Sequence, residues 1–296
     1  MRKCSDLPSE LLNRRVAVEE IYANGLSHAS NHGLDTAELA FINMPEHGGT
    51  KAHVYGDSSV DQVLHLFRML DGQALSSRSA FYDLGSGSGR LTLLVHLFTP
   101  AALSVGIELS PTRHMQATAA QHHSRHLIDD QRGLRFIGPS SMLDVELSDA
   151  THVYVFNLCF DESFLQRLGE RLIAQLPVGA SILLYGKQFP PGLPFGRTSS
   201  NGGKRLELRL RMMMYYGYRI VAEGRAASAS VLRLNLNSKT ASLGATRFTR
   251  SFLHDPMNDD LAARPLCALA MVHGRTEWLW REWGGSGARV GTPART

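Results

Sequence analysis

The feature that most constrains the fold is a glycine-rich turn between a short apolar segment and a helical one. The turn reads Asp83-Leu-Gly-Ser-Gly-Ser-Gly89 and ends the apolar run 79–84, which we interpret as a strand. A run with helical periodicity, 90–98, follows directly, and Glu108 ends the next apolar run, about 20 residues beyond the last glycine. This order predicts an α/β domain that binds a ligand at the carboxyl ends of parallel strands.

The spacing of the glycines narrows the choice of ligand. A dinucleotide loop has the spacing G-x-G-x-x-G, which would place its third glycine at Arg90, and no Gly-Lys-Ser/Thr follows as a P-loop requires. A carboxylate at Asp83 would repel a pyrophosphate but attract the ammonium and sulfonium of S-adenosylmethionine. We therefore predict this cofactor, with Glu108 accepting the ribose hydroxyls; a plain Gly/Ser turn is the alternative. The residues predicted to hold the methionine end are Asp83, Gly85, Ser86, Gly87 and Gly89.

The rest of the chain alternates helix and strand patterns. Predicted helices cover 8–23, a short stretch after the capping box Asp35-Thr-Ala-Glu38, 60–70, 111–128, 162–175 and 204–216. Predicted parallel strands cover 79–84, 102–108, 134–137, 151–156 and 180–185. Segments 218–223 with 228–236, and 268–273, are predicted to form a terminal antiparallel pair. The expected fold is α/β, the Rossmann-like fold of class I methyltransferases, with a mostly parallel sheet.

Composition sets outer limits on the kind of protein. The 296 residues carry 31 basic and 27 acidic side chains, a net charge of +4 that permits an anionic partner without requiring one. Three cysteines exclude a disulfide framework and favour a reducing compartment. No apolar run approaches the ~18 residues that a membrane helix needs. We expect a soluble intracellular protein with an N-terminal helical extension (1–52), a methyltransferase domain (53–283) and a disordered tail (284–296).

Two further segments bear on substrate binding. Ser140 or Ser141, after the third strand, would meet the adenine, although a backbone group or a plain turn fits as well. At the end of the fourth strand, Asn157 and Phe160 can orient and desolvate an amine. An Asn-Pro-Pro-aromatic motif, typical of base-amine methylation, is missing here, and Cys159 is better explained as a small buried hydrophobe than as a nucleophile.

These segments resemble the histone lysine methyltransferases without a SET domain, the disruptor-of-telomeric-silencing (Dot1-like) family. Val54-Tyr-Gly-Asp57 with Ser59-Val-Asp61 is similar to that family's V-Y-G-E and T-F-D loop, and segment 83–108 to its cofactor loop and ribose acid. Val153–Phe160 resembles its N-N-F-A-F segment, with Phe156 in place of the first Asn, and Gly186–Phe189 its S-K-P-F turn. The family's Gly-Asp-Phe adenine motif is replaced by Pro139-Ser-Ser141.

The resemblance implies methylation of a lysine ε-amine on a nucleosomal histone, and residence in the nucleus. Tyr55, Asp57 and Ser58 would close over the methionine end of the cofactor, while Asn157, Phe160 and Tyr55 would form the catalytic lysine channel. Burial of the lysine would favour its neutral form, so we predict no dedicated strong base. Two alternatives stay open: a methyltransferase of a non-histone protein or small molecule, and a non-catalytic chromatin-binding module.

Three other patterns have competing interpretations. His122, His123 and His126 share a predicted helix, either as a metal site or, as we favour, as a solvated face. The basic segment 197–211 is either the solvated side of an amphipathic helix or a patch for DNA phosphates; its cations are Arg197, Lys204, Arg205, Arg209 and Arg211. Trp278, Trp280 and Trp283 are either a platform for stacking bases or, as we favour, packing residues of a last helix.

Overall fold

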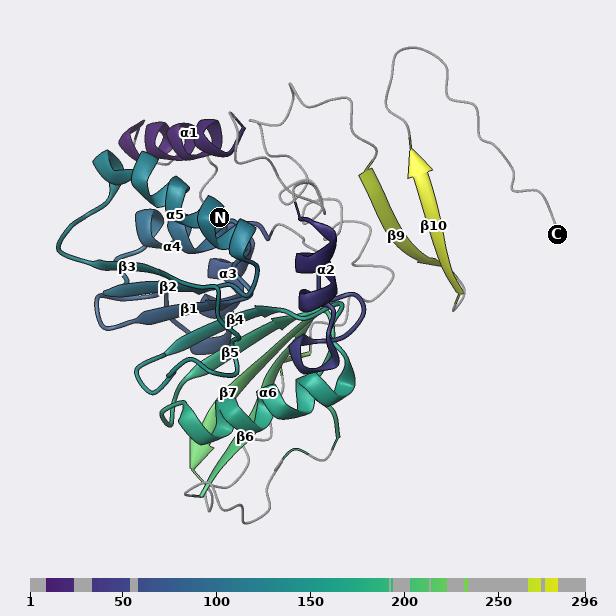
Figure 1. Cartoon of the computed structure of the whole chain (residues 1–296). Helices are drawn as coiled ribbons and strands as arrows, with labels where there is room; N and C mark the ends of the chain where they lie inside the picture. The colour runs from purple at the N-terminus through teal and green to yellow at the C-terminus, as the bar shows by residue number, and fades with distance from the viewer. Residues whose placement is uncertain are drawn as a thin grey trace. The chain divides into compact units, whose positions relative to one another are not determined.

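The computed structural model describes residues 9–23, 34–53, 58–191, 193, 203–212, 214–222, 232–233, 266–272 and 275–281. The chain divides into two compact units, 1–234 and 235–296. The first unit contains the helices and the main sheet, and the second contains a two-stranded antiparallel sheet of β9 (Leu266–Val272) and β10 (Arg275–Arg281) (Figure 1).

The main sheet has the strand order β3-β2-β1-β4-β5-β7-β6-β8. Its strands are β1 (Ala80–Leu84), β2 (Leu103–Ile107), β3 (Gly133–Ile137), β4 (His152–Phe156), β5 (Ser181–Tyr185), β6 (Lys204–Met212), β7 (Tyr215–Ala222) and β8 (Leu232–Arg233). Strands β1 to β5 are parallel, whereas β7 runs antiparallel to both β5 and β6. This order, with one reversed strand beside β5, is that of class I methyltransferases, so the predicted fold class is confirmed.

Helices cover both faces of the sheet (Figure 1). The set comprises α1 (Ser9–Ala23), α2 (Thr36–Ile42), the 3-10 turn η2 (Pro45–His47), α3 (Val60–Asp71), α4 (Arg90–Phe98), α5 (Pro111–His123), the 3-10 turn η3 (Arg125–Leu127) and α6 (Glu162–Gln175). Helices α3, α4 and α5 lie on one face, and α6 lies on the other. The buried face of α6 carries Phe164, Leu168 and Leu172, which join the same apolar cluster as the central strands.

Local sequence signals explain several helix boundaries. The carboxylate of Asp35 accepts the N–H of Glu38 at 2.7 Å, as the capping box predicts for the start of α2. Ser110 caps α5 through the N–H of Arg113, with Pro111 in the first turn. Helix α5 is shorter than the helix predicted at 111–128, because it ends at His123 and a separate 3-10 turn follows.

The prediction of a helix at 204–216 is wrong. That segment forms β6 and the start of β7, and its apolar residues Leu206, Leu208, Leu210 and Met212 recur at every second position, which is the period of a strand. Leu206 and Leu210 are buried against the core, so the alternation reflects one covered face. Basic residues between the leucines had suggested a helix with a charged side.

The terminal antiparallel pair exists, but between other segments than those predicted. Strand β7 pairs with β6 over most of its length, while the described residues of the predicted partner 228–236 form the short β8, parallel to β6. The last helix expected around the tryptophans is also wrong, since Trp278 and Trp280 belong to strand β10. Segment 284–296, predicted as a disordered tail, lies outside the described residues.

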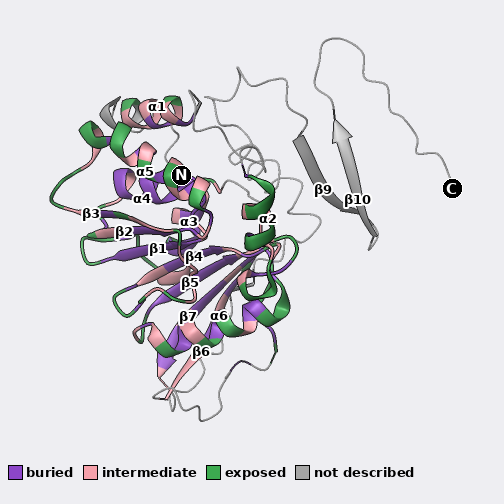
Figure 2. Ribbon diagram, in the orientation of Figure 1, coloured by how far each residue is buried: buried purple, intermediate pink, exposed green. Residues whose placement is uncertain are grey.

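The central strands are buried, and the loops that follow them form the expected ligand-binding edge of the sheet. All five residues of β1 are buried, as are the inner residues of β4 and β5 (Figure 2). Because parallel strands share one direction, the loops after β1, β2, β3 and β4 meet at a single edge of the sheet. That edge carries the glycine loop, Glu108, Ser140–Ser141 and the segment after β4.

Candidate functional site

The glycine loop is held to the next strand by its backbone. The N–H groups of Gly85 and Ser86 both donate to the carbonyl oxygen of Ile107, at 2.8 and 2.9 Å. Gly89, the N-cap of α4, has φ +81°, and a Cβ there would lie 2.5 Å from Cε1 of Phe136. Glycine is required at this point because both the backbone angle and the close contact exclude a side chain.

Glu108 lies at the end of β2 and closes the loop from the side. One carboxylate oxygen accepts the N–H of Gly87 at 2.7 Å, and the other accepts the N–H of Ser110 at 2.8 Å. The side chain lines a pocket at this edge of the sheet, although only 6% of the residue is exposed. Each carboxylate oxygen retains a second lone pair, so Glu108 can still accept hydroxyl donors from a ribose.

Asp83 lies beneath the glycine loop, away from the pocket wall. It is buried, and its carboxylate accepts the hydroxyl of Thr92 at 3.1 Å. Burial raises the pKa of Asp83 to about 7, the Thr92 hydrogen bond opposes this shift, and the negative charge of Glu108 adds to it. A cation bound nearby would favour the ionised form, as the predicted cofactor ammonium or sulfonium would.

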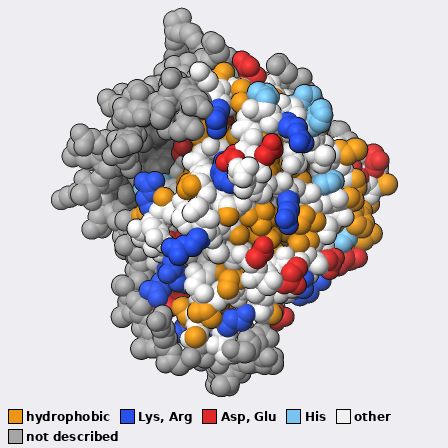
Figure 3. Space-filling view, turned by 90° about the vertical axis from the view of Figure 1, so that its left-hand side faces the viewer, with side chains coloured by type: hydrophobic (Ala, Val, Ile, Leu, Met, Phe, Trp, Pro, Cys, Tyr) orange, Lys and Arg blue, Asp and Glu red, His pale blue; other side chains and the backbone are white. Residues whose placement is uncertain are grey.

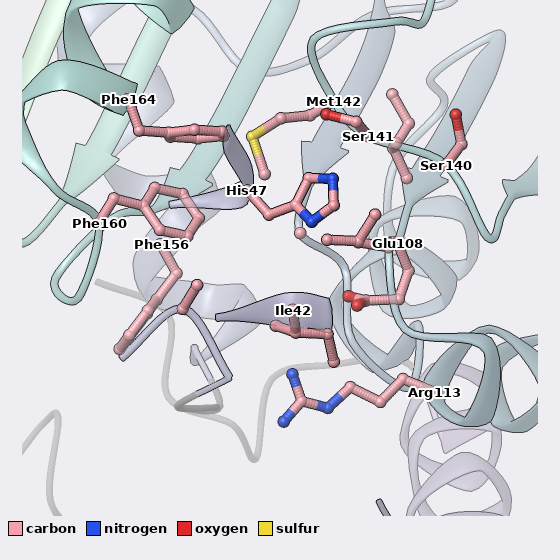
Figure 4. Close-up of a pocket in the computed structure, with 14 residues that line it drawn as sticks. Ile42, His47, Glu108, Arg113, Ser140, Ser141, Met142, Phe156, Phe160 and Phe164 are labelled. Atoms are coloured by element: carbon pink, nitrogen blue, oxygen red, sulfur yellow. The ribbon is translucent and has the colours of Figure 1, made fainter. Parts of the chain in front are cut away.

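The pocket brings together residues that are distant in sequence (Figure 4). Five of the predicted site residues line it: Gly85, Glu108, Ser140, Ser141 and Phe160. The sequence analysis missed other lining residues, among them Ile42, His47, Arg113, Met142, Phe156 and Phe164. The first two come from α2 and η2, segments that had been assigned to an extension outside the catalytic domain.

The described residues fit S-adenosylmethionine. The hydroxyl of Ser86 is buried in the loop and has no hydrogen-bond partner among the described residues. A Cβ at Gly85 would lie 3.5 Å from Met142, so this part of the loop faces the pocket at close range. Together with the pocket-facing Glu108, these groups form a polar cradle beside an apolar wall. That combination suits a nucleoside joined to an amino acid.

Asn157 is engaged with the turn after β5 rather than with the pocket. Its side chain is fully buried; Nδ2 donates to the carbonyl oxygen of Lys187 at 2.8 Å, and Oδ1 accepts the Lys187 N–H at 2.9 Å. Lys187 Nζ in turn donates to the carbonyl oxygen of Phe160 at 2.7 Å. Phe160 lies in the pocket wall, its ring 4.9 Å from that of Phe164. Roles of Asn157 and Phe160 in catalysis stay predictions.

The predicted lid loop is only partly described. Tyr55 and Asp57 lie outside the described residues, whereas Ser58 shares a hydrogen bond with the hydroxyl of Tyr154 on β4. Burial raises the pKa of Tyr154 well above its usual value, so this hydroxyl stays protonated. Tyr154 thus fixes one end of the loop to the sheet, and the roles of Tyr55, Asp57 and Ser58 stay predictions.

Helix α1 braces the glycine loop from behind. The hydroxyl of Tyr22 donates to the carbonyl oxygen of Ser88 at 3.0 Å, and Glu19 pairs with Arg90 of α4 at 2.5 Å. Arg15 pairs with Asp61 of α3 at 2.9 Å. Sequence periodicity identified α1 as a helix, but no local signal indicated that its polar side chains reach the loop.

Other candidate groups show no competing site. His122, His123 and His126 are exposed, and no cluster of three metal-ligating side chains occurs in the described parts of the chain. Burial raises the pKa of the Cys159 thiol, which weakens it as a nucleophile. None of the helices that the structure describes is long and apolar enough to cross a bilayer.

The predicted basic segment is not a helical patch. Lys204 donates to the carbonyl oxygens of Ala174 and Leu176, and Arg209 pairs with Glu207 at 3.0 Å. Arg211 lies over the ring of Tyr216 at 6.0 Å, and Arg197 is outside the described residues. On the face shown in Figure 3, Lys and Arg side chains lie among Asp and Glu side chains.

Residues 46–192, which contain the glycine loop, Glu108 and the β4 and β5 turns, match the family model described as Histone methylation protein DOT1. This segment is Dot1-like. A Caenorhabditis elegans protein named histone-lysine N-methyltransferase, H3 lysine-79 specific, is 26% identical over 146 residues, which is 45% of this chain. The match spans only 14% of that relative's length.

The chain is also similar, at low TM-scores, to two solved structures whose names describe methyltransferases. An RNA methyltransferase from Salinibacter ruber in complex with S-adenosyl-L-homocysteine is 20% identical and has a TM-score of 0.40; the match covers 60% of this chain and 100% of that one. Phosphoethanolamine N-methyltransferase 1 from Haemonchus contortus is 10% identical with a TM-score of 0.41, covering 81% of this chain and 64% of that one.

Proposed function

We propose that this protein transfers a methyl group from S-adenosylmethionine to a lysine ε-amine of a nucleosomal histone. The observation that carries the proposal is a pocket that combines the glycine loop and Glu108 with an aromatic wall, inside a segment that is Dot1-like. The polar half suits the cofactor and the apolar half suits an alkyl amine. The name of the C. elegans relative specifies H3 lysine-79, so this lysine is the first candidate substrate to test.

Cofactor binding depends on the loop after β1 and on two acids. S-adenosylmethionine supplies a methyl group on a sulfonium, which an amine can displace. Glu108, fixed by the N–H groups of Gly87 and Ser110, would accept the ribose hydroxyls. Asp83 would stabilise the positive charge of the methionine end in its ionised form. These contacts hold the cofactor in one orientation, and such positioning is a main source of rate in displacement reactions.

The aromatic residues would prepare the amine. Phe156, Phe160 and Phe164 line the same pocket and exclude water from its apolar half. Because burial disfavours an ammonium, a lysine that enters would lose its proton to water more readily. The lone pair of the amine nitrogen would then form the N–C bond, while the electrons of the broken S–C bond return to sulfur. Desolvation and alignment would supply the rate without a strong base.

We further propose that the protein acts in the nucleus and that segment 197–211 adds contacts to DNA phosphates. Arg211 is exposed on β6 and can reach a phosphate. Removal of one phosphate contact should lower the slope of log affinity against log salt by about 1. Nucleosome binding by Arg211→Ala, measured across a salt series, tests this part: an unchanged slope rejects a role for Arg211.

The substrate proposal is tested with radiolabelled cofactor on intact nucleosomes, free histones and bulk lysate. We expect label in a nucleosomal histone, recovered as methyl-lysine after acid hydrolysis. Nucleosomes with H3 lysine-79 replaced by arginine show whether the same lysine is used. With the cofactor below saturation, a Glu108→Gln variant should lower the signal by roughly ten- to a hundredfold, whereas exchange of the exposed Glu162 should leave it unchanged.

The competing functions give different results in the same assay. Label confined to a lysate protein or to a small-molecule fraction indicates a different substrate. Nucleosome binding without any label, by protein that does bind the cofactor, indicates a non-catalytic chromatin module. Methyl-arginine, or no label with any substrate, contradicts the proposed reaction.

A further inference from the structure

We infer that the segment 36–53, here called the clamp, is part of the cofactor site: His47 is a cofactor-binding residue and Glu38 is a positioning residue that holds the clamp in place. The inference rests on the proposed cofactor. Helix α2, with Glu38, lies wholly ahead of the Dot1-like segment, which begins at residue 46, whereas His47 lies at the start of that segment.

Glu38 connects the clamp to the ribose acid. Its carboxylate accepts the hydroxyl of Ser110, and also the N–H and hydroxyl of Thr112 at 3.1 and 2.7 Å. Ser110 is the same residue whose N–H donates to Glu108 at 2.8 Å. Two carboxylates, one on the clamp and one in the pocket, therefore share a residue at the first turn of α5. The positive end of the helix dipole stabilises both negative charges there.

Further contacts hold the clamp on both sides of the pocket. The Arg113 guanidinium, in the pocket wall, donates to the carbonyl oxygen of His53, and the side chain of Asn43 bonds to the ring of His53 at 2.7 Å. On the opposite side, the N–H of Asp161 donates to the carbonyl oxygen of Gly48 at 2.9 Å. The clamp is therefore fixed to α5 and to the start of α6, with Ile42 and His47 facing the space between them.

One hydrogen bond defines which nitrogen of the His47 ring carries the hydrogen. Its Nδ1 lies 2.8 Å from the carbonyl oxygen of Phe41, and a carbonyl can only accept, so Nδ1 carries a hydrogen. In the neutral ring, Nε2 is then an acceptor. Figure 4 shows the ring extending into the pocket between Met142 and Glu108. An acceptor at this place suits an N–H or O–H donor of the adenosyl group, either the adenine amine or a ribose hydroxyl.

Two substitutions of His47 separate a local structural role from a ligand contact. Asparagine can keep the bond to the Phe41 carbonyl but lacks the atom that occupies the Nε2 position. Glutamine can place a polar atom near the Nε2 position. Calorimetry with S-adenosylhomocysteine should show about tenfold weaker binding for His47→Asn and near wild-type binding for His47→Gln. His126→Ala, which removes an exposed histidine, is the control.

The ligand series locates the donor. 5′-Methylthioadenosine should show the same dependence on His47 as the whole by-product, since the contact is to the adenosyl half. 5′-Methylthioinosine lacks the exocyclic amine: a dependence that persists assigns the ribose, and one that disappears assigns the amine. A dependence seen with S-adenosylhomocysteine but not with methylthioadenosine overturns the adenosyl assignment.

Glu38→Ala tests the positioning role, with Glu46→Ala as the matched control. Both remove a carboxylate from the clamp, but Glu46 is exposed, and its one hydrogen bond within the described part of the chain is from Arg167 to its backbone oxygen. We expect several-fold weaker cofactor binding for Glu38→Ala alone. In the background of His47→Asn, Glu38→Ala should add little, because it acts through the clamp. Melting curves establish that each variant is folded.

The outcomes separate this inference from the proposed function. If the wild-type protein binds the cofactor and His47→Asn or Glu38→Ala binds it with the same affinity, the role of that residue is overturned, while the proposed function stands. If His47→Gln binds S-adenosylhomocysteine as weakly as His47→Asn does, the role of His47 as a hydrogen-bond acceptor is overturned. Wild-type protein that binds no adenosyl ligand overturns both the proposed function and this inference.

Discussion

The side-chain amide of Asn157 pairs with both backbone groups of Lys187, donating to its carbonyl oxygen at 2.8 Å and accepting its N–H at 2.9 Å. This pair joins the end of β4 to the turn after β5, and Lys187 then holds the backbone of Phe160. Asn157 therefore affects the aromatic wall through the turn. Gly186 in this turn approaches Leu158 so closely that a Cβ would lie 2.5 Å from its Cα.

Asn157→Ala should reduce turnover more than cofactor binding. The substitution leaves the N–H and C=O of Lys187 without partners, which costs about 1–3 kcal/mol of unfolding free energy and loosens the turn that supports Phe160. Urea unfolding measures the first effect and single-turnover methylation the second. Full turnover in Asn157→Ala would contradict a role for this pair in shaping the acceptor side.

Asp83→Asn should raise thermal stability at pH 8 and weaken cofactor binding. The folded-state pKa of Asp83, about 7, lies above its ordinary 3.8, so the folded protein holds this proton more tightly than the unfolded chain. The resulting stability is complete below pH about 4 and is lost as pH rises to about 7. Because asparagine removes the buried charge, the free energy of unfolding should rise by on the order of a few kcal/mol at pH 8 and by less at pH 5. Melting curves at the two pH values provide the check.

Cofactor affinity should rise between pH 6 and pH 8. A cationic ligand prefers ionised Asp83, and the fraction ionised increases through its pKa of about 7. Binding near pH 7 should therefore release protons, which calorimetry detects as a dependence of the heat on the ionisation enthalpy of the buffer. In Asp83→Asn this proton release should disappear; its persistence would assign the titration to another group.

Glu108→Gln should weaken cofactor binding by roughly ten- to a hundredfold, the usual range for losing a charge-assisted hydrogen bond. The amide keeps one oxygen acceptor but replaces the other with a donor that faces the N–H of Gly87 or Ser110. The loss should be equal for S-adenosylhomocysteine and for methylthioadenosine, since the ribose is common to both. A greater loss for the complete by-product would place Glu108 against the amino-acid half.

Much of the cofactor cradle followed from sequence because its signals are local. The strand, the glycines and the helix after them are consecutive, and Glu108 lies one strand further on, so the shared edge of a parallel sheet brings them together. Asp35 could be identified as a helix cap because its partner, Glu38, is three residues away. Strand β6 also carries a local signal, because Leu206, Leu208 and Leu210 recur at every second position as in a strand. The basic residues between them led instead to the prediction of an amphipathic helix.

The order of the amino acids alone was enough to predict the fold class, the glycine loop and an acid at the end of β2, because each depends on short-range periodicity or on a motif of fixed spacing. Packing in three dimensions was needed to show that Glu38 turns from its own helix toward Ser110, that His47 enters the pocket, and that Asn157 binds the Lys187 backbone. These contacts join segments 30 to 72 positions apart. Their formation depends on how helices and turns pack around the sheet, which no local pattern encodes.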